Sequence, residues 1–195
     1  MLKKKLGGMA LAGLLAPAFA GAQGLSYNYV QGGVAFYPSA DLSAGSGLDQ
    51  DFIGLDADAR LAITDDVFVL GGFQYLTDDV DYTAFHVGGG YRFALDPSTD
   101  LWGGLTIEYQ EFDFSSGFGG SSVDDTAIGL RGGVRHQLNP ELELAGSLRV
   151  VTGDGDYVGL RGTATYYMRP DLGFFGSLDI FDGDPGLIAG ARFTF

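Results

Sequence analysis

The stretch Leu187–Phe195, which reads LIAGARFTF, decides the fold. Every second position in it is apolar: Leu187, Ala189, Ala191, Phe193 and Phe195. Because successive side chains of a strand point to opposite faces, this pattern predicts a strand with one apolar and one polar face. Nearly every other segment of the chain repeats the pattern. Such repetition is typical of a β-barrel whose outside meets lipid and whose inside meets water or polar side chains.

The first 22 residues have the features of a secretory signal peptide. Three consecutive lysines precede the apolar run Leu6–Leu15, and small residues then offer cleavage after Ala20 or Ala22. A membrane-spanning helix, the alternative, needs roughly 20 apolar residues, and Pro17 interrupts the run. We therefore expect export of the chain and removal of this segment.

The remaining segment, residues 23–195, has the length of one domain. All lysines lie in the predicted signal, so this segment carries 8 arginines against 25 acids, a net charge of −17. That balance argues against a nucleic-acid partner. Cysteine is absent, which excludes disulfides and thiolate metal sites, and no motif indicates a cofactor.

Alternation with period two predicts ten strands, most of them long enough for a tilted membrane crossing. They are about 25–37, 50–64, 67–77, 81–94, 100–114, 125–137, 141–152, 157–168, 172–181 and 187–195. A water-soluble sandwich would show the same alternation, because there too one face is buried.

Two further patterns favour the membrane barrel over the sandwich. The first is the connections, which alternate between short turns and longer acidic or Gly/Ser-rich loops, as in outer-membrane barrels. The longer loops are expected at 38–49, 77–81, 115–124, 152–156 and 181–186. The second is the position of the charges, because all eight arginines fall on the less apolar face of their strands: Arg60, Arg92, Arg131, Arg135, Arg149, Arg161, Arg169 and Arg192.

Arginine facing lipid near the bilayer midplane costs about 2–4 kcal/mol, so this segregation is expected where one face is truly apolar solvent. The acids within strands share the inward face: Asp56, Asp58, Glu108, Glu143 and Asp179. The sequence therefore predicts an all-β protein, a ten-stranded antiparallel up-and-down transmembrane barrel. We expect it in the outer membrane of a Gram-negative bacterium, with both chain termini periplasmic.

Four stretches carry a resemblance to a known family: Leu25–Gly33 (LSYNYVQGG), Gly88–Tyr91 (GGGY), Val134–Glu143 (VRHQLNPELE) and Gly190–Phe193 (GARF). They resemble small outer-membrane barrels known as diffusible-signal-factor-regulated outer-membrane proteins, within the OmpA-like barrel group. The family name describes regulation of expression, so the resemblance implies fold and location but no activity. It also implies that the barrel-assembly machinery reads the last strand, a role that Phe193 and Phe195 fit.

A ten-stranded barrel encloses a narrow interior, because about eight strands leave room for side chains alone. We expect the lumen to be lined by Asp56, Asp58, Arg60, His86, Arg92, Glu108, Arg131, Arg135, Glu143, Arg149, Arg161, Asp179 and Arg192. Inward tyrosines and Gln74 would add to this set: Tyr27, Tyr29, Tyr82 and Tyr167. Two interpretations follow: a plugged barrel with a structural or interaction role, or a narrow, weakly anion-preferring pore for small solutes.

Catalysis is not expected, and no catalytic residue is assigned. Outer-membrane hydrolases need a histidine beside serine or aspartate near the outer rim. The chain has two histidines, His86 within a predicted strand and His136 beside a short turn, and no predicted loop contains one.

The predicted loops are rich in aspartate. Their charge is sufficiently explained by solubility, and the loops could also bind a partner. The sequence assigns no metal site, although four residues are weak candidates for surface divalent ions: Asp154, Asp156, Asp182 and Asp184. Such ions would bridge the loops to phosphates of lipopolysaccharide, which with outer-membrane lipid is the expected partner.

Overall fold

The computed structural model describes residues 25–40, 50–78, 80–114, 121–153 and 156–195. The predicted signal segment, residues 1–22, lies outside them. The described residues form ten antiparallel strands: β1 (Tyr29–Ala40), β2 (Gln50–Ala62), β3 (Val67–Thr77), β4 (Val80–Asp96), β5 (Thr99–Phe114), β6 (Ser121–Asn139), β7 (Leu142–Thr152), β8 (Tyr157–Arg169), β9 (Leu172–Phe181) and β10 (Asp184–Thr194). Among these residues, no helix has the length and apolar character needed to cross a membrane.

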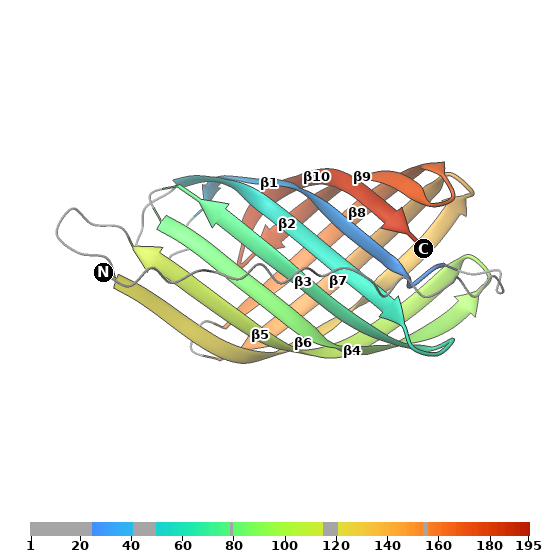
Figure 1. Ribbon diagram of the computed structural model, residues 1–195, viewed down its shortest axis with the longest axis horizontal. Coiled ribbons are helices and arrows are strands. Elements are labelled where there is room, and N and C mark those ends of the chain that lie inside the picture. The colour runs from blue at the N-terminus through green and yellow to red at the C-terminus, as the bar shows by residue number, and fades with distance from the viewer. Residues whose placement is uncertain (1–24, 41–49, 79, 115–120, 154–155) are drawn as a thin grey trace, which may run out of the picture.

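The strands pair in chain order, and β1 closes against β10 to complete the barrel (Figure 1). The closing register runs from Tyr29 opposite Thr194 to Phe36 opposite Leu187. The backbone N–H of Phe195 then donates a hydrogen bond to the carbonyl oxygen of Asn28 (3.0 Å). Closure removes the unpaired edges that an open sheet would present, and it confirms the predicted all-β, ten-stranded antiparallel barrel.

The side chains of β5 illustrate why the sequence alternates with period two. Trp102, Thr106 and Glu108 are buried, whereas Leu105 and Ile107 between them are 62% and 61% exposed. The other strands repeat this arrangement, so the outer wall of the barrel is covered with exposed Leu, Ile, Val and Phe side chains. The interior receives the polar and aromatic side chains.

One end of the barrel, called the turn end below, holds the β2–β3, β4–β5, β6–β7 and β8–β9 connections together with residues 25 and 195. Proline is the first residue of three two-residue turns there: Pro97, Pro140 and Pro170. The side chains of Asp96 and Asn139 accept hydrogen bonds from the backbone N–H groups of Ser98 (2.8 Å) and Glu141 (2.9 Å). Proline presets the first φ of such turns, and Asx side chains complete them.

The opposite end, called the loop end below, has two connections that are much shorter than the predicted loops. Longer loops were expected at 77–81 and 181–186, but β4 already begins at Val80 and β10 at Asp184. The β9–β10 turn consists of Asp182 (φ 48°) and Gly183 (φ 101°). Positive φ at both residues is the requirement of a tight type I′ hairpin, for which Asp-Gly is a preferred sequence. The acidic composition of 181–186 was therefore a turn signal, and the prediction of a longer loop was wrong.

Candidate functional site

The interior of the barrel is the candidate functional site, and its side chains form three layers along the axis. An aromatic layer fills the loop end, a belt of arginines and carboxylates occupies the middle, and a second aromatic layer lies at the turn end.

The loop-end aromatic layer contains Tyr37, Phe52, Tyr82, Tyr157 and Phe181, all nine-tenths or more buried. The ring of Phe181 stacks on Tyr157 (4.4 Å between centroids) and meets Tyr82 edge-on (5.6 Å). These contacts join β4, β8 and β9 across the lumen. Rings from three strands therefore pack against one another at this end of the interior.

Close backbone approach lets a large ring lie flat against the inner wall. The ring of Tyr37 covers Gly186, and any Cβ at that position would overlap it. Phe68 lies over Gly90 in the same way. Part of the glycine content of the strands therefore makes room for the aromatic filling.

Asp179 on β9 anchors the central belt, and its side chain is fully buried. Its carboxylate accepts two hydrogen bonds from Arg149 (2.9 and 2.7 Å) and one from Arg161 (2.8 Å). The hydroxyl of Tyr37 donates a further bond (2.6 Å). A buried carboxylate needs such a set of charge-assisted partners to offset its lost hydration.

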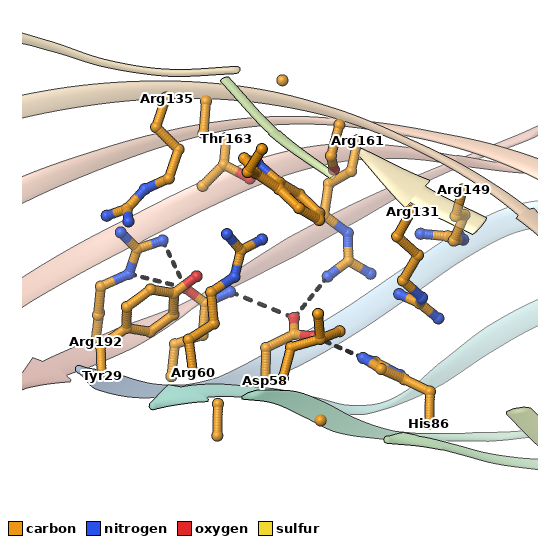
Figure 2. Close-up of a pocket in the computed structure, with 18 of the residues that line it drawn as sticks. Tyr29, Asp58, Arg60, His86, Arg131, Arg135, Arg149, Arg161, Thr163 and Arg192 are labelled. Atoms are coloured by element: carbon orange, nitrogen blue, oxygen red, sulfur yellow. Dashed lines mark hydrogen bonds and ion pairs between the residues drawn. The ribbon is translucent and has the colours of Figure 1, made fainter. Parts of the chain in front are cut away.

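Arg161 extends the belt across the lumen. Besides Asp179, its guanidinium donates to Asp56 (3.1 and 2.9 Å) and Asp58 (3.1 Å) on β2. Around the wall, β9, β10 and β1 separate β8 from β2 on the shorter path, so the bridge spans the interior. Figure 2 shows Arg161 reaching Asp58, which His86 approaches from the other side (3.6 Å).

Two further groups of ion pairs flank this bridge. Arg131 and Glu108 form a bidentate pair (2.9 and 2.8 Å). Glu143 holds both Arg135 (2.9 and 3.0 Å) and Arg192 (3.0 Å). Such fork-to-fork geometry fixes the side chains as well as neutralising them.

Gln31 and Tyr167 add hydrogen bonds to the group formed by Glu143, Arg135 and Arg192. Arg192 donates twice to the side-chain oxygen of Gln31 (2.9 and 2.7 Å), and Tyr167 donates to Glu143 (2.9 Å).

The turn-end layer contains Tyr27, Phe68 and Trp102, with the guanidinium of Arg60 3.9 Å from the Trp102 ring centroid. Residues 25–28 precede β1 and enter this layer. The carbonyl oxygens of Leu25 and Ser26 accept hydrogen bonds from Arg92 (3.3 Å) and Arg135 (2.7 Å), respectively. The N-terminal part of the described chain therefore covers the interior at the turn end.

A cavity of about 80 Å³ lies inside the barrel, and Figure 2 shows residues that line it. A second cavity of about 30 Å³ lies on the loop-end side and shares five lining residues with the first: Asp58, His86, Arg131, Arg149 and Arg161. The belt thus stands between two small cavities.

The structure places the predicted lumen residues as follows. Twelve of them bond one another or a neighbouring interior group: Asp56, Asp58, His86, Arg92, Glu108, Arg131, Arg135, Glu143, Arg149, Arg161, Asp179 and Arg192. Arg60 lies inside with aromatic contacts instead. Tyr27, Tyr29, Tyr82, Tyr167 and Gln74 also lie within the interior.

Arg169 differs from its predicted inward position. Its side chain is 63% exposed and pairs with Asp171 at the turn end (2.9 Å). The β8–β9 pairing shifts register between Tyr167 and Arg169, so the alternation on which the prediction relied breaks there.

The interior residues that the sequence analysis missed as functional candidates include Tyr37, Gln31 and Asp100. Asp100 is buried and lies 3.5 Å from Arg92. It starts a predicted strand on the same face as Trp102, so extending the alternation by one position would have found it. Tyr37 and Gln31 lie on the inward face of their strand, but they are uncharged, and the lumen residues were identified mainly by their charge.

The remaining candidates lie outside the belt. Phe193 is exposed on the outer wall and stacks with Phe195 (6.4 Å between centroids). Of the weak candidates for divalent ions, Asp154 lies outside the described residues, and Asp182 occupies the tight hairpin turn. Within the described part of the chain, no group of three or more His, Asp or Glu side chains is arranged to hold a metal ion.

Together, the strand pairing and interior contacts define the class of this protein: a closed ten-stranded antiparallel β-barrel with a charged interior. No protein-family model and no curated protein matches the chain.

Solved structures do match. The attachment invasion locus protein Ail of Yersinia pestis is 20% identical, with 85% of this chain and 97% of that one covered and a TM-score of 0.49. Neisserial surface protein A is 14% identical, with 87% and 98% covered and a TM-score of 0.48. The N-terminal β-barrel domain of Pseudomonas aeruginosa OprF is 15% identical, with 86% and 98% covered and a TM-score of 0.43.

Proposed function

We propose that this chain is a non-enzymatic barrel of a Gram-negative outer membrane, with a closed lumen and a structural or interaction role. The exposed outer wall supports the membrane location. Leu178, Leu105 and Ile107 are each more than 60% exposed, and a continuous apolar wall of this kind is expected where the surrounding solvent is lipid.

The observation that carries the closed lumen is the bridge from Arg161 to Asp56 and Asp58 across the middle of the barrel. The loop-end aromatic layer lies on one side of it, and residues 25–28 lie on the other. An ion crossing the barrel would have to break buried ion pairs, each of which costs about 3–5 kcal/mol when one partner is removed.

The histidines support a non-enzymatic role. His86 contacts Asp58 inside the barrel, and His136 shares a hydrogen bond with Thr99 (2.9 Å) at the turn end. Neither arrangement is the serine–histidine or outer-rim aspartate–histidine pair that a barrel hydrolase needs.

We place the turn end, where residues 25 and 195 lie (Figure 1), in the periplasm and the loop end outside, where lipopolysaccharide would be its neighbour. Both termini of the chain left after signal removal would then be periplasmic. Membership of the diffusible-signal-factor-regulated group belongs to the same proposal. The exposed Phe193 and the terminal Phe195 are proposed as the part of β10 that the barrel-assembly machinery reads.

One observation favours a second function, a narrow anion-preferring pore: the larger cavity is lined by six arginines. Conductance of the refolded protein in a planar bilayer, with a salt gradient to report selectivity, distinguishes the two. A closed lumen predicts no discrete openings from wild-type protein whose folding is verified by heat-modifiable gel mobility.

The matched variants are Tyr82→Ala/Arg161→Ala, which thins the aromatic layer and removes the bridge, and Arg169→Ala at the exposed turn. We expect openings from the first variant and none from the second. Anion-selective openings in the wild type would refute the closed lumen and support the anion-preferring pore.

A further inference from the structure

We propose that the larger cavity is a binding site for one small oxoanion, such as phosphate or sulfate, and that Arg60 is its principal ligand. This inference goes beyond the proposed function, because a closed barrel needs no ligand inside it.

The first observation is an imbalance of charge around the cavity. Six arginines line it: Arg60, Arg131, Arg135, Arg149, Arg161 and Arg192. In the described residues, ion pairs join five of these arginines, all but Arg60, to five carboxylates: Asp56, Asp58, Glu108, Glu143 and Asp179. Only Asp58 is itself part of the lining. The group therefore carries one positive charge in excess, and the cavity wall is strongly cationic.

The second observation identifies Arg60 as the excess charge. Among the described residues, no carboxylate pairs with its guanidinium, and its Nη1 atom is buried without a hydrogen-bond partner. Its contacts are with aromatic faces, of which Trp102 (3.9 Å) and Phe68 (5.2 Å) are the nearest. An aromatic face attracts the cation but accepts none of the five N–H bonds that a guanidinium can donate.

The third observation is a pair of like charges on the cavity wall. Arg131 on β6 lies directly opposite Arg149 on β7 in the strand register, and both line the cavity (Figure 2). Like charges opposite each other on neighbouring strands are destabilising. Glu108 and Asp179 neutralise the two arginines separately, and an anion in the cavity would offset their repulsion further.

The size and closure of the cavity select the ligand. A water molecule needs roughly 10–15 Å³ of such space, so about 80 Å³ accommodates several waters or one tetrahedral anion of five heavy atoms. The aromatic layers at both ends and residues 25–28 exclude long ligands. Thr163 also lines the wall, and its hydroxyl shares a hydrogen bond with that of Ser177 (2.8 Å). The chemistry therefore fits a free oxoanion rather than a lipid headgroup.

Trp102 fluorescence can report binding, because Trp102 is the single tryptophan of the chain, lines the cavity and contacts Arg60. The protein is refolded in detergent micelles at increasing sulfate or phosphate, with chloride keeping the ionic strength constant. Refolding at each concentration removes any dependence on entry of the anion into a closed barrel. We expect a saturating change in Trp102 emission with either oxoanion.

Arg60→Gln tests the ligand, and Arg169→Gln removes the same charge at an exposed site as its control. Apparent affinity should fall at least tenfold in Arg60→Gln and stay unchanged in Arg169→Gln. Without oxoanion, Arg60→Gln should fold at least as well as wild type, because it removes an unpaired buried charge.

Equilibrium dialysis with radiolabelled phosphate provides a second readout that does not depend on fluorescence. The expected result is one phosphate per wild-type barrel and background binding for Arg60→Gln. No retained phosphate in the wild type would overturn the proposal, and so would equal binding by the two proteins.

Discussion

Asp179→Asn is the most informative single substitution in the central belt. The change keeps the size of the side chain and removes its charge. Arg149 would then lose its carboxylate partner within the described part of the chain, whereas Arg161 would keep Asp56 and Asp58.

The expected cost follows from the burial of this pair. The side chain of Asp179 is fully buried and that of Arg149 is 9% exposed. Removing one partner of a buried ion pair costs about 3–5 kcal/mol, because the other charge remains in a poorly solvated site. The equilibrium constant for unfolding should therefore rise by a factor between about 10² and 10⁴.

Asp171→Asn is the matched control, because it makes the same chemical change in an exposed pair. Asp171 and Arg169 are 45% and 63% exposed. Exposed pairs contribute only about 0–1 kcal/mol, so this variant should unfold almost as the wild type does.

Equilibrium urea unfolding in phospholipid vesicles measures both variants. Trp102 is buried in the turn-end layer, so its emission should report exposure to water on unfolding. Heat-modifiable gel mobility provides an independent measure of the folded fraction, and the two curves should coincide.

A third variant separates loss of charge balance from loss of packing. Arg149→Met/Asp179→Leu removes both partners, and Arg161 keeps its two remaining carboxylates. Apolar replacement of a whole buried pair is often neutral or stabilising, so we expect this variant to regain most of the stability. The reasoning is refuted if Asp179→Asn costs no more than Asp171→Asn, or if the double variant is less stable than the single one.

Three further predictions address the wall of the barrel and the β9–β10 turn. Leu105→Arg should destabilise the protein in vesicles by about 2–4 kcal/mol, whereas Leu138→Arg beside the turn end should cost about 0–1 kcal/mol. Equal costs in urea unfolding would contradict a lipid-facing wall, because the cost of arginine depends on its depth in the bilayer. Gly190→Val should lower the folded yield on heat-modifiable gels, because its Cβ would overlap the backbone of β1, and Gly176→Val, with open space, should fold normally. Gly183→Ala should cost about 1 kcal/mol in urea unfolding because of its positive φ, and an unchanged midpoint would rule out the tight turn.

The strands and their inward and outward faces could be predicted from the sequence, because both depend on local alternation and on the cost of each side chain in lipid. Alternation has a period of two wherever a wall separates lipid from a polar interior, and arginine on the lipid side is costly. Arg131 and Glu108 could thus be placed inside without knowledge of any contact.

The partners of those charges could not be predicted. Arg161 reaches Asp56 and Asp58 because strand tilt and stagger bring β8 and β2 to the same height in the lumen. A single sequence contains no direct signal for that stagger. Local irregularity limits the prediction too, since the register shift before Arg169 interrupts the alternation there.

The pairing of β1 with β10 has a consequence for synthesis of the protein. β1 pairs with β2 on one side and with β10 on the other, where Tyr29 lies opposite Thr194. One edge of the first strand therefore lacks its partner until nearly the whole chain has left the ribosome. Contacts so distant in sequence form slowly. Until then the polypeptide exposes its apolar side chains and two unpaired β-edges. It must reach the bilayer in that unfinished state without aggregating, and a truncation that removes β10 would leave a sheet with no means of closing.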